Sequence, residues 1–428
     1  MDPTSIAFIA LAVCLFAAFS QKAEHSPLTP PMFFLGVGLL LGDAGIGWVH
    51  LEIDGEAMQV LVELTLVLVL FTDAARIDIT CLRHEGSLPT RLLGFGMPLT
   101  IAAGAAAAIV VLPGLGWAEA LLLAAILTPT DAALGQAVVN NPLVPLRIRQ
   151  SLNVESGLND GIALPVVLVF ASIAGAHEDP VDAGYWLRFA ALAVTLGPLV
   201  GAAVGFIGGR VIGSGTQSGW INPAFQRIAG LGLALLAYGA AESVGGNGFI
   251  AAFVAGLTLG NTARGVCECL YEFGEAEGQL LTLLVFFAFG AAMLPEALPH
   301  ITGSAILYAL LSLTVVRMVP VALSLLGTGL RPTSIAFIGW FGPRGLASIL
   351  FALLVVEEGS LESAPFLLTV VALTVLGSTF LHGLSAYPIA RRYGEFASAI
   401  AAAKAEHEDA PELPVRISHA PASTEAGD

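Results

Sequence analysis

The chain has 428 residues, of which 56% are hydrophobic and only 12% are charged. An ordinary soluble domain carries about 25% charged residues, so the composition excludes that class and favours a membrane protein. Long unbroken apolar runs exclude the alternating pattern of a transmembrane β-barrel, which leaves a bundle of helices. The net charge of −16 argues against nucleic acid as a partner.

The hydropathy pattern predicts an all-α protein with thirteen transmembrane helices, because a spanning helix needs about 20 mostly apolar residues. The predicted spans lie at about residues 4–20, 27–42, 56–76, 91–112, 115–139, 150–175, 184–207, 225–243, 247–262, 276–295, 301–327, 332–356 and 363–388.

Most basic residues fall on one side of this predicted topology. The loops after the odd-numbered spans and the C-terminal tail contain 14 of the 17, namely Lys22, Arg76, Arg83, Arg91, Arg147, Arg149, Arg210, Arg227, Arg264, Arg331, Arg391, Arg392, Lys404 and Arg416. The loops after the even-numbered spans contain none. Loops rich in Lys and Arg stay in the cytoplasm, so we expect the N-terminus outside and the C-terminus inside.

Thirteen spans divide the chain into two six-helix halves of opposite orientation, joined by the seventh span. This inverted repeat is the plan of many secondary transporters. We therefore predict a transmembrane domain at 1–392, with repeat one at about 1–175, a linker helix at about 184–207 and repeat two at about 225–390. Residues 393–428 are predicted to form a short acidic cytoplasmic tail that is helical at first and then disordered. A solvated end without function is favoured over a regulatory one.

Two predicted spans at matching positions of the two halves contain helix breakers. Pro129 interrupts the fifth span, and the run from Gly342 to Gly345, with Pro343 inside it, interrupts the twelfth. A proline inside a helix removes a hydrogen bond and clashes with the preceding turn. Broken helices at corresponding positions of inverted repeats indicate an ion site at the membrane midplane.

Charged residues inside the predicted spans are candidates for function, because burying a charge in lipid is costly. These residues are Asp73, Asp131, Glu155, Asp160, Arg317 and Arg344. Helix positions i and i+4 share a face, so Ser156 lies beside Asp160 on the sixth span. The predicted site for a cation and a proton consists of Asp160, Asp131, Ser156, Thr130 and Asp73, whose oxygen atoms suit a hard cation.

Arg344 needs a partner, and the sequence favours Glu155. A buried ion pair between them would join the sixth span to the break in the twelfth. A ligand role for Glu155 is the alternative. Arg317 is assigned no role in the site.

Three motifs resemble the monovalent cation–proton antiporters, in particular the NhaP-type sodium/proton antiporters. The motifs are Thr-Pro-Thr-Asp at 128–131, Glu-Ser-x-x-Asn-Asp at 155–160 and Gly-Pro-Arg-Gly at 342–345, and the resemblance covers about residues 1–392. It implies a homodimer with the NhaA-like antiporter fold, in which Asp160 is the essential ion- and proton-binding carboxylate. Asn159 would support the unwound part of the fifth span, and Asn in place of a second Asp implies electroneutral one-for-one exchange.

Two positions depart from the family pattern. Many members have proline directly after the aspartate of the fifth span, whereas here Ala132 follows Asp131. Asp73 is shorter than the glutamate that some relatives carry at that place.

We therefore expect a secondary active transporter, not an enzyme, in a bacterial or archaeal plasma membrane. It would exchange Na⁺ or Li⁺ for H⁺ and need no cofactor beyond these transported ions. A K⁺/H⁺ antiporter and a cation channel stay open as alternatives. An intramembrane hydrolase that uses Asp131 and Asp160 as its acid and base, and a non-transporting scaffold, are less favoured.

Overall fold

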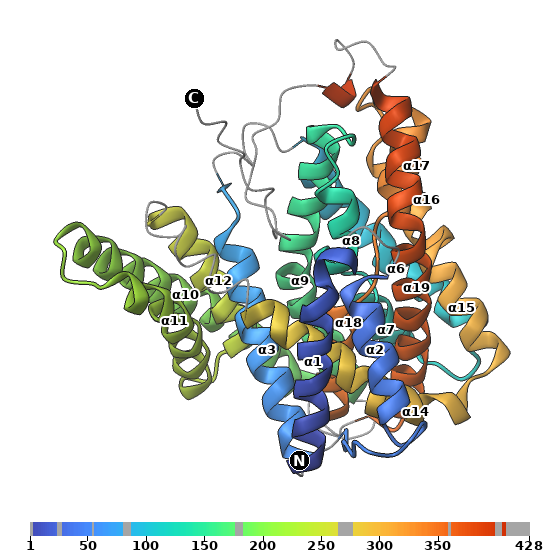
Figure 1. Ribbon diagram of the computed structural model, residues 1–428, viewed down its shortest axis with the longest axis horizontal. Helices are drawn as coiled ribbons and strands as arrows, with labels where there is room; N and C mark the ends of the chain where they lie inside the picture. Colours follow the sequence, from blue (N-terminus) through green and yellow to red (C-terminus); the bar gives the residue numbers. More distant parts are fainter. Residues whose placement is uncertain are drawn as a thin grey trace.

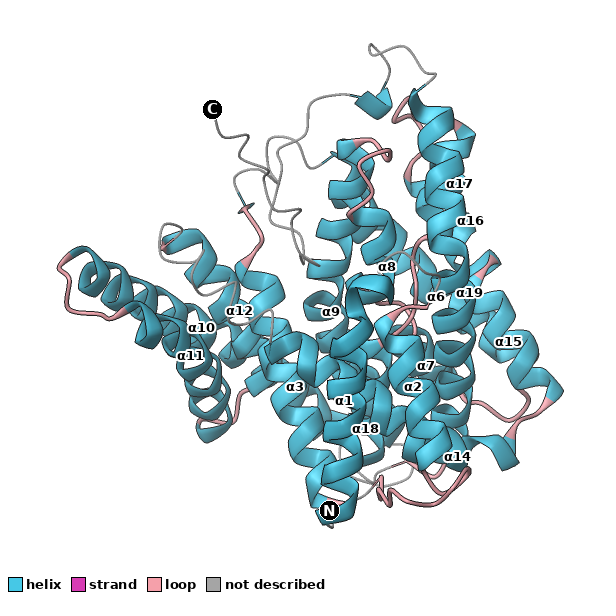
Figure 2. Ribbon diagram, in the orientation of Figure 1, coloured by secondary structure: helices cyan, strands magenta, loops and turns pink. Residues whose placement is uncertain are grey.

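The computed structural model describes residues 3–23, 28–53, 55–79, 87–175, 183–263, 277–357, 361–398 and 405–407. Within these ranges every regular element is helical, which confirms the predicted all-α class (Figure 2). Eight of the described helices are long and apolar enough to cross a membrane, judged by length and composition. Four shorter apolar helices accompany them, so the number of thirteen crossings stays a prediction.

The helices have the following bounds in chain order. They are α1 (Pro3–Ala23), α2 (Pro30–Leu41), α3 (Glu56–Ala75), α5 (Ser87–Arg91), the π-helical turn η1 (Leu92–Gly96), α6 (Met97–Val111), α7 (Trp117–Ile126), α8 (Ala132–Val139), α9 (Leu146–Gly175), α10 (Ala183–Gln217), α11 (Pro223–Ser243), α12 (Gly248–Thr262), a helical span Glu277–His300 that ends in η2 (Phe289–Met293), α14 (Leu294–Ala297) and η3 (Leu298–His300), then α15 (Gly303–Leu313), α16 (Val315–Ser324), α17 (Pro332–Trp340), α18 (Leu346–Glu357), α19 (Ala364–Ser398) and η4 (Ala405–His407).

Both predicted helix breaks are confirmed. Residues 127–131 separate α7 from α8, and residues 341–345 separate α17 from α18. Pro129 and Pro343 have no N–H group, and each restricts the residue before it to extended conformations. Each break therefore leaves helix-end amides and carbonyls in the interior, where other parts of the protein must bind them.

Helices α10 and α11 lie to one side of the main bundle, and α12 packs between α10 and α3 (Figure 1). Two glycines of α12, Gly256 and Gly260, lie directly against the carbonyl groups of Phe71 and Ala75 in α3. Small residues four apart allow helix backbones in a membrane to approach closely. The contact fixes the last two turns of α3, which carry Asp73.

The last long helix continues into the first residues of the predicted tail. Helix α19 ends at Ser398, beyond the predicted span at about 363–388. Beyond it, residues 405–407 are described, and the rest of the predicted tail lies outside the described residues.

We expect the α3–α12 contact to be sensitive to a single methyl group. Gly260→Ala places a Cβ against the Ala75 carbonyl and should lower the free energy of unfolding by about 1–3 kcal/mol, the usual cost of overpacking. Gly213→Ala in α10 is the matched control, because a Cβ there meets no atom within 4 Å. It should leave stability unchanged or raise it by about 0.5–1 kcal/mol. Thermal unfolding in detergent measures both, and equal effects would contradict the predicted close contact.

Candidate functional site

The two interrupted helices meet at their breaks and bind each other's main-chain groups. The N–H of Asp131 donates to the carbonyl of Pro343 at 2.8 Å. The guanidinium of Arg344 donates to the carbonyls of Thr128 and Pro129, the latter at 3.3 Å. These carbonyls follow the C-terminal end of α7, where a positive charge is favourable. The break in one helix therefore supplies the partners for the other.

The carboxylate of Asp131 caps two helices at once. Its Oδ1 accepts from the N–H of Ala133 at 2.7 Å, at the start of α8, and its Oδ2 accepts from the N–H of Leu346 at 2.8 Å, at the start of α18. A side chain at Gly345 would collide with this carboxylate, so glycine is required there. The negative charge of Asp131 thus lies at the positive ends of two half-helices.

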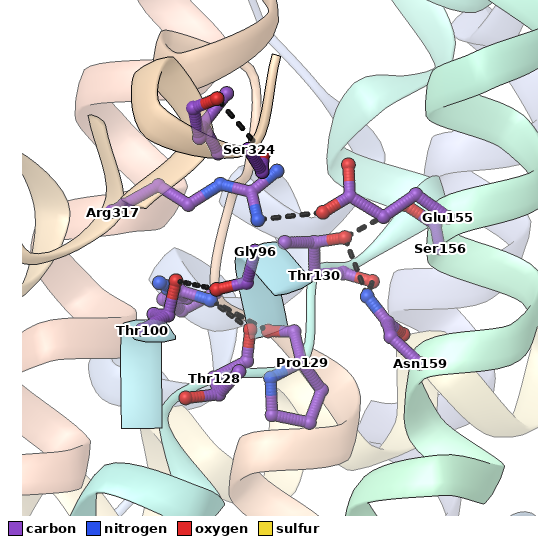
Figure 3. A network of polar contacts seen from close by, with 12 residues as sticks. Gly96, Thr100, Thr128, Pro129, Thr130, Glu155, Ser156, Asn159, Arg317 and Ser324 are labelled. Carbon is purple, nitrogen blue, oxygen red and sulfur yellow. Dashed lines mark hydrogen bonds and ion pairs between the residues drawn. The ribbon is translucent and has the colours of Figure 1, made fainter. Parts of the chain in front are cut away.

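Thr130 joins the unwound segment to α9. Its Oγ1 lies 3.0 Å from Ser156 Oγ and accepts a hydrogen bond of 2.7 Å from Asn159 Nδ2 (Figure 3). The Asn159 side chain is 2% exposed, and its Oδ1 accepts no hydrogen bond from the described part of the chain. The structure therefore brings together three predicted side chains, Thr130, Ser156 and Asn159, in one polar network.

The prediction that Glu155 pairs with Arg344 is wrong, because Glu155 pairs with Arg317 instead. Glu155 Oε1 lies 2.6 Å from the NH1 group of Arg317 in α16, with both side chains almost fully buried (Figure 3). Arg317 reaches this position beside Gly342, where any side chain would collide with its guanidinium. The guanidinium of Arg344 is instead directed to the carbonyls that follow α7. The sequence contained a signal for this role of Arg317, because a charged residue inside a predicted membrane span needs a partner.

The other two predicted ligands lie on α9 and α3. Asp160 follows Asn159 and is partly exposed, whereas Asp73 lies in the last turn of α3 with 9% of its surface exposed. A carbon on Gly157 of α9 would lie 3.9 Å from the Asp73 carbonyl, so α9 and α3 pass closely there. Among the described residues, no three Asp, Glu, His or Cys side chains lie close enough together to hold a metal ion.

Helix α19 binds the break at 341–345 through Ser378 and His382, which sequence analysis missed. Ser378 Oγ accepts from the N–H of Arg344 at 2.6 Å and lies 3.1 Å from Nδ1 of His382. His382 is 1% exposed. A serine and a histidine four positions apart in a predicted span, and therefore on one helix face, were the available signal. The main chain of the twelfth predicted span is thereby anchored to the thirteenth.

A cavity of about 30 Å³, large enough to hold a water molecule, lies between α2, α3, α8 and the Glu277–His300 helix. Its polar lining includes Thr72 of α3, Gln136 of α8, and Gln279 and Thr282 of the Glu277–His300 helix. Thr72 precedes Asp73, and the lining residue Ala133 lies two positions after Asp131. By the predicted topology the cavity lies toward the cytoplasmic side. Arg76, which follows α3, also lines this cavity.

Comparisons with known proteins agree with this geometry. Residues 7–392 match the family model described as "Sodium/hydrogen exchanger, transmembrane". The K⁺/H⁺ antiporter NhaP of Alkalimonas amylolytica is 24% identical over 400 residues, 91% of this chain and 67% of that protein. The K⁺/H⁺ antiporter NhaP2 of Shewanella sp. (strain MR-4) is 26% identical over 397 residues, 91% of this chain and 68% of that protein.

Among solved structures, the sodium proton antiporter MjNhaP1 from Methanocaldococcus jannaschii superposes with a TM-score of 0.73 at 20% identity. The match covers 92% of this chain and 98% of that one, which shows that the two share a fold. With a family model matched over nearly the whole membrane domain and the two crossed helix breaks in place, the chain belongs to the sodium/hydrogen exchanger family.

Proposed function

We propose that the protein exchanges Na⁺ or Li⁺ for H⁺, one for one, by alternating access at Asp160. Thr130, Ser156, Asp131 and Asp73 would complete the cation site. Membership of the exchanger family and the shared fold indicate a membrane transporter and not an enzyme. We expect a homodimer in the plasma membrane, with the C-terminus in the cytoplasm.

The observation that carries this proposal is the difference in exposure among the carboxylates around the breaks. Asp131 is 7% exposed and Glu155 3% exposed, and each has a fixed partner, two helix N-termini in one case and Arg317 in the other. Asp160 is partly exposed on the same helix as Glu155. Asp160 Oδ1 is buried, so the exposure belongs to the rest of the residue. A carboxylate that is more exposed than its neighbours suits a group that binds and releases its ligand in every cycle.

One shared carboxylate is sufficient for antiport. A proton and a monovalent cation each neutralise Asp160, so only one of them can be bound at a time. Asn159 is uncharged and donates to Thr130 in either state. The charge of the site therefore changes by one when the proton leaves, and one monovalent cation restores it.

K⁺/H⁺ exchange is the second candidate, because both relatives compared above carry that name. The structural neighbour is named a sodium proton antiporter. The oxygen ligands proposed here suit either ion, so the site geometry decides between them. The Na⁺ assignment and the K⁺ assignment use the same residues and differ in the cation that supports exchange.

We predict that Asp160→Asn abolishes cation-linked proton movement in liposomes, because an amide neither releases a proton nor neutralises a cation. Purified protein would be reconstituted with a pH dye inside, and NaCl, LiCl, KCl or choline chloride added to collapse an imposed pH gradient. Asp43→Asn, which changes an exposed acid in the same way, is the control and should retain exchange.

The same assay separates the candidates. Collapse of the gradient by NaCl and LiCl alone supports sodium exchange, whereas collapse by KCl supports the second candidate. A membrane-potential clamp should leave the rate unchanged if exchange is one for one. Normal exchange by Asp160→Asn would overturn the proposed site.

We predict that Glu155 is energetically coupled to Arg317. Glu155→Gln and Arg317→Gln should each lower the free energy of unfolding by about 3–5 kcal/mol, because each leaves a buried charge unpaired. The double variant should lose clearly less than the sum of the two. Chemical unfolding of the three variants measures this coupling, and a stronger coupling of Glu155 to Arg344→Gln would contradict the assignment.

A further inference from the structure

The short turn η4 (Ala405–His407) lies against the bundle, although sequence analysis favoured a solvated tail. The side chain of Glu406 is only 1% exposed. By contrast, the side chain of Glu395 near the end of α19, which pairs with Arg391, is 60% exposed. An acid on a solvated tail should resemble Glu395, so the burial of Glu406 needs a specific cause.

The cause is a set of donors at the start of α17. Glu406 Oε1 accepts from the N–H of Arg331, the N-cap residue of α17, at 2.9 Å and from Ser334 Oγ at 3.0 Å. The hydroxyl of Tyr393 in α19 donates to Ser334 Oγ at 3.0 Å. The N-cap side chain itself makes no capping bond, so the tail carboxylate takes that place.

A second anchor joins the same turn to α9. The guanidinium of Arg147 donates to the carbonyl of Ala405 and, at 3.2 Å, to Ser87 Oγ of α5. The methyl group of Ala405 also packs close to Gly329, just before α17. Glu406 Oε2 is buried and accepts no hydrogen bond within the described ranges, which leaves the charge of the Arg331 side chain to offset it.

We propose that the N-terminus of α17, with Ser334 and Tyr393, is a built binding site for an acidic peptide segment, and that the protein's own tail occupies it through Glu406. The docked segment holds the starts of α17 and α9 together at the end of the bundle predicted to face the cytoplasm. Helix α17 leads directly into the break at 341–345, and α9 carries Asp160. Docking thus acts on both elements of the candidate site.

The protonation of Glu406 agrees with a bound carboxylate. Burial raises its pKa, but the N–H groups of Arg331 and Glu406, the Ser334 hydroxyl and the Arg331 charge together lower it by more. The pKa therefore lies below the ordinary carboxyl value. A lowered pKa contributes stability that is present above the ordinary value and is lost as the pH falls through the lowered one.

The test compares full-length Glu406→Ala with Glu395→Ala, which removes an exposed acid in the same way. Hydrogen exchange of the α17 amides should accelerate about tenfold or more in Glu406→Ala, because the first turn loses its cap. The control should retain the protection of the unchanged protein. Equal protection in all three proteins would overturn the proposal.

A double-mutant cycle provides an independent measurement. Ser334→Ala and Glu406→Ala should together lower the melting temperature by less than the sum of their separate effects, because they remove one interaction. Additive effects would contradict the site. Neither measurement needs an ion gradient, so failure here is distinguishable from failure of the proposed exchange at Asp160.

The pH dependence gives a further expected result. The difference in melting temperature between the unchanged protein and Glu406→Ala should be complete at neutral pH. It should decrease as the pH falls below the ordinary carboxyl range, because protonation removes the charge that the N–H of Arg331 and the hydroxyl of Ser334 bind. The other ionisable groups at the site are Arg147 of α9, Arg331 at the start of α17 and Tyr393 of α19. A difference that is independent of pH would contradict a charge-dependent site.

Discussion

The structure depends on the way in which two broken helices bind each other inside the bundle. A helix break exposes amide and carbonyl groups, and lipid offers these groups no partner. Here the carboxylate of Asp131 binds the first amides of α8 and α18, and Arg344 binds the carbonyls that follow α7. Each break is stable only in the presence of the other, so the candidate ion site forms where the two meet.

The neighbouring helices hold this crossing in one geometry. Ser378 of α19 binds the amide of Arg344, and Ser348 of α18 donates to the carbonyl of Ile126 at 2.8 Å. Arg317 of α16 offsets the charge of Glu155 in α9. Because these supporting groups bind one another, the change of charge that we propose at Asp160 would leave their ion pair and hydrogen bonds intact. Such an arrangement would suit a carrier that binds two different ions in turn.

The sequence was sufficient to locate the breaks and the polar residues near them. Pro129 and the Gly-Pro-Arg-Gly run violate helix geometry in any context, and buried polar residues stand out against apolar spans. The partner of Glu155 could not be predicted, because spacing along one helix carries no information about which of two arginines on other helices is nearer. The same limit applies to Glu406, whose hydrogen-bond donors Arg331 and Ser334 lie more than 70 positions away.

Helix α17 connects the two parts of the molecule for which we propose functions. It has nine residues and is therefore about 13 Å long. In so short a helix a large share of the N–H and C=O groups belongs to the unpaired ends, so its position depends on what binds those ends. Glu406 binds one end, and the break that contacts Asp131 follows the other. The tail and the candidate ion site therefore contact opposite ends of the same short helix. A movement of α17 caused by one of them would reach the other.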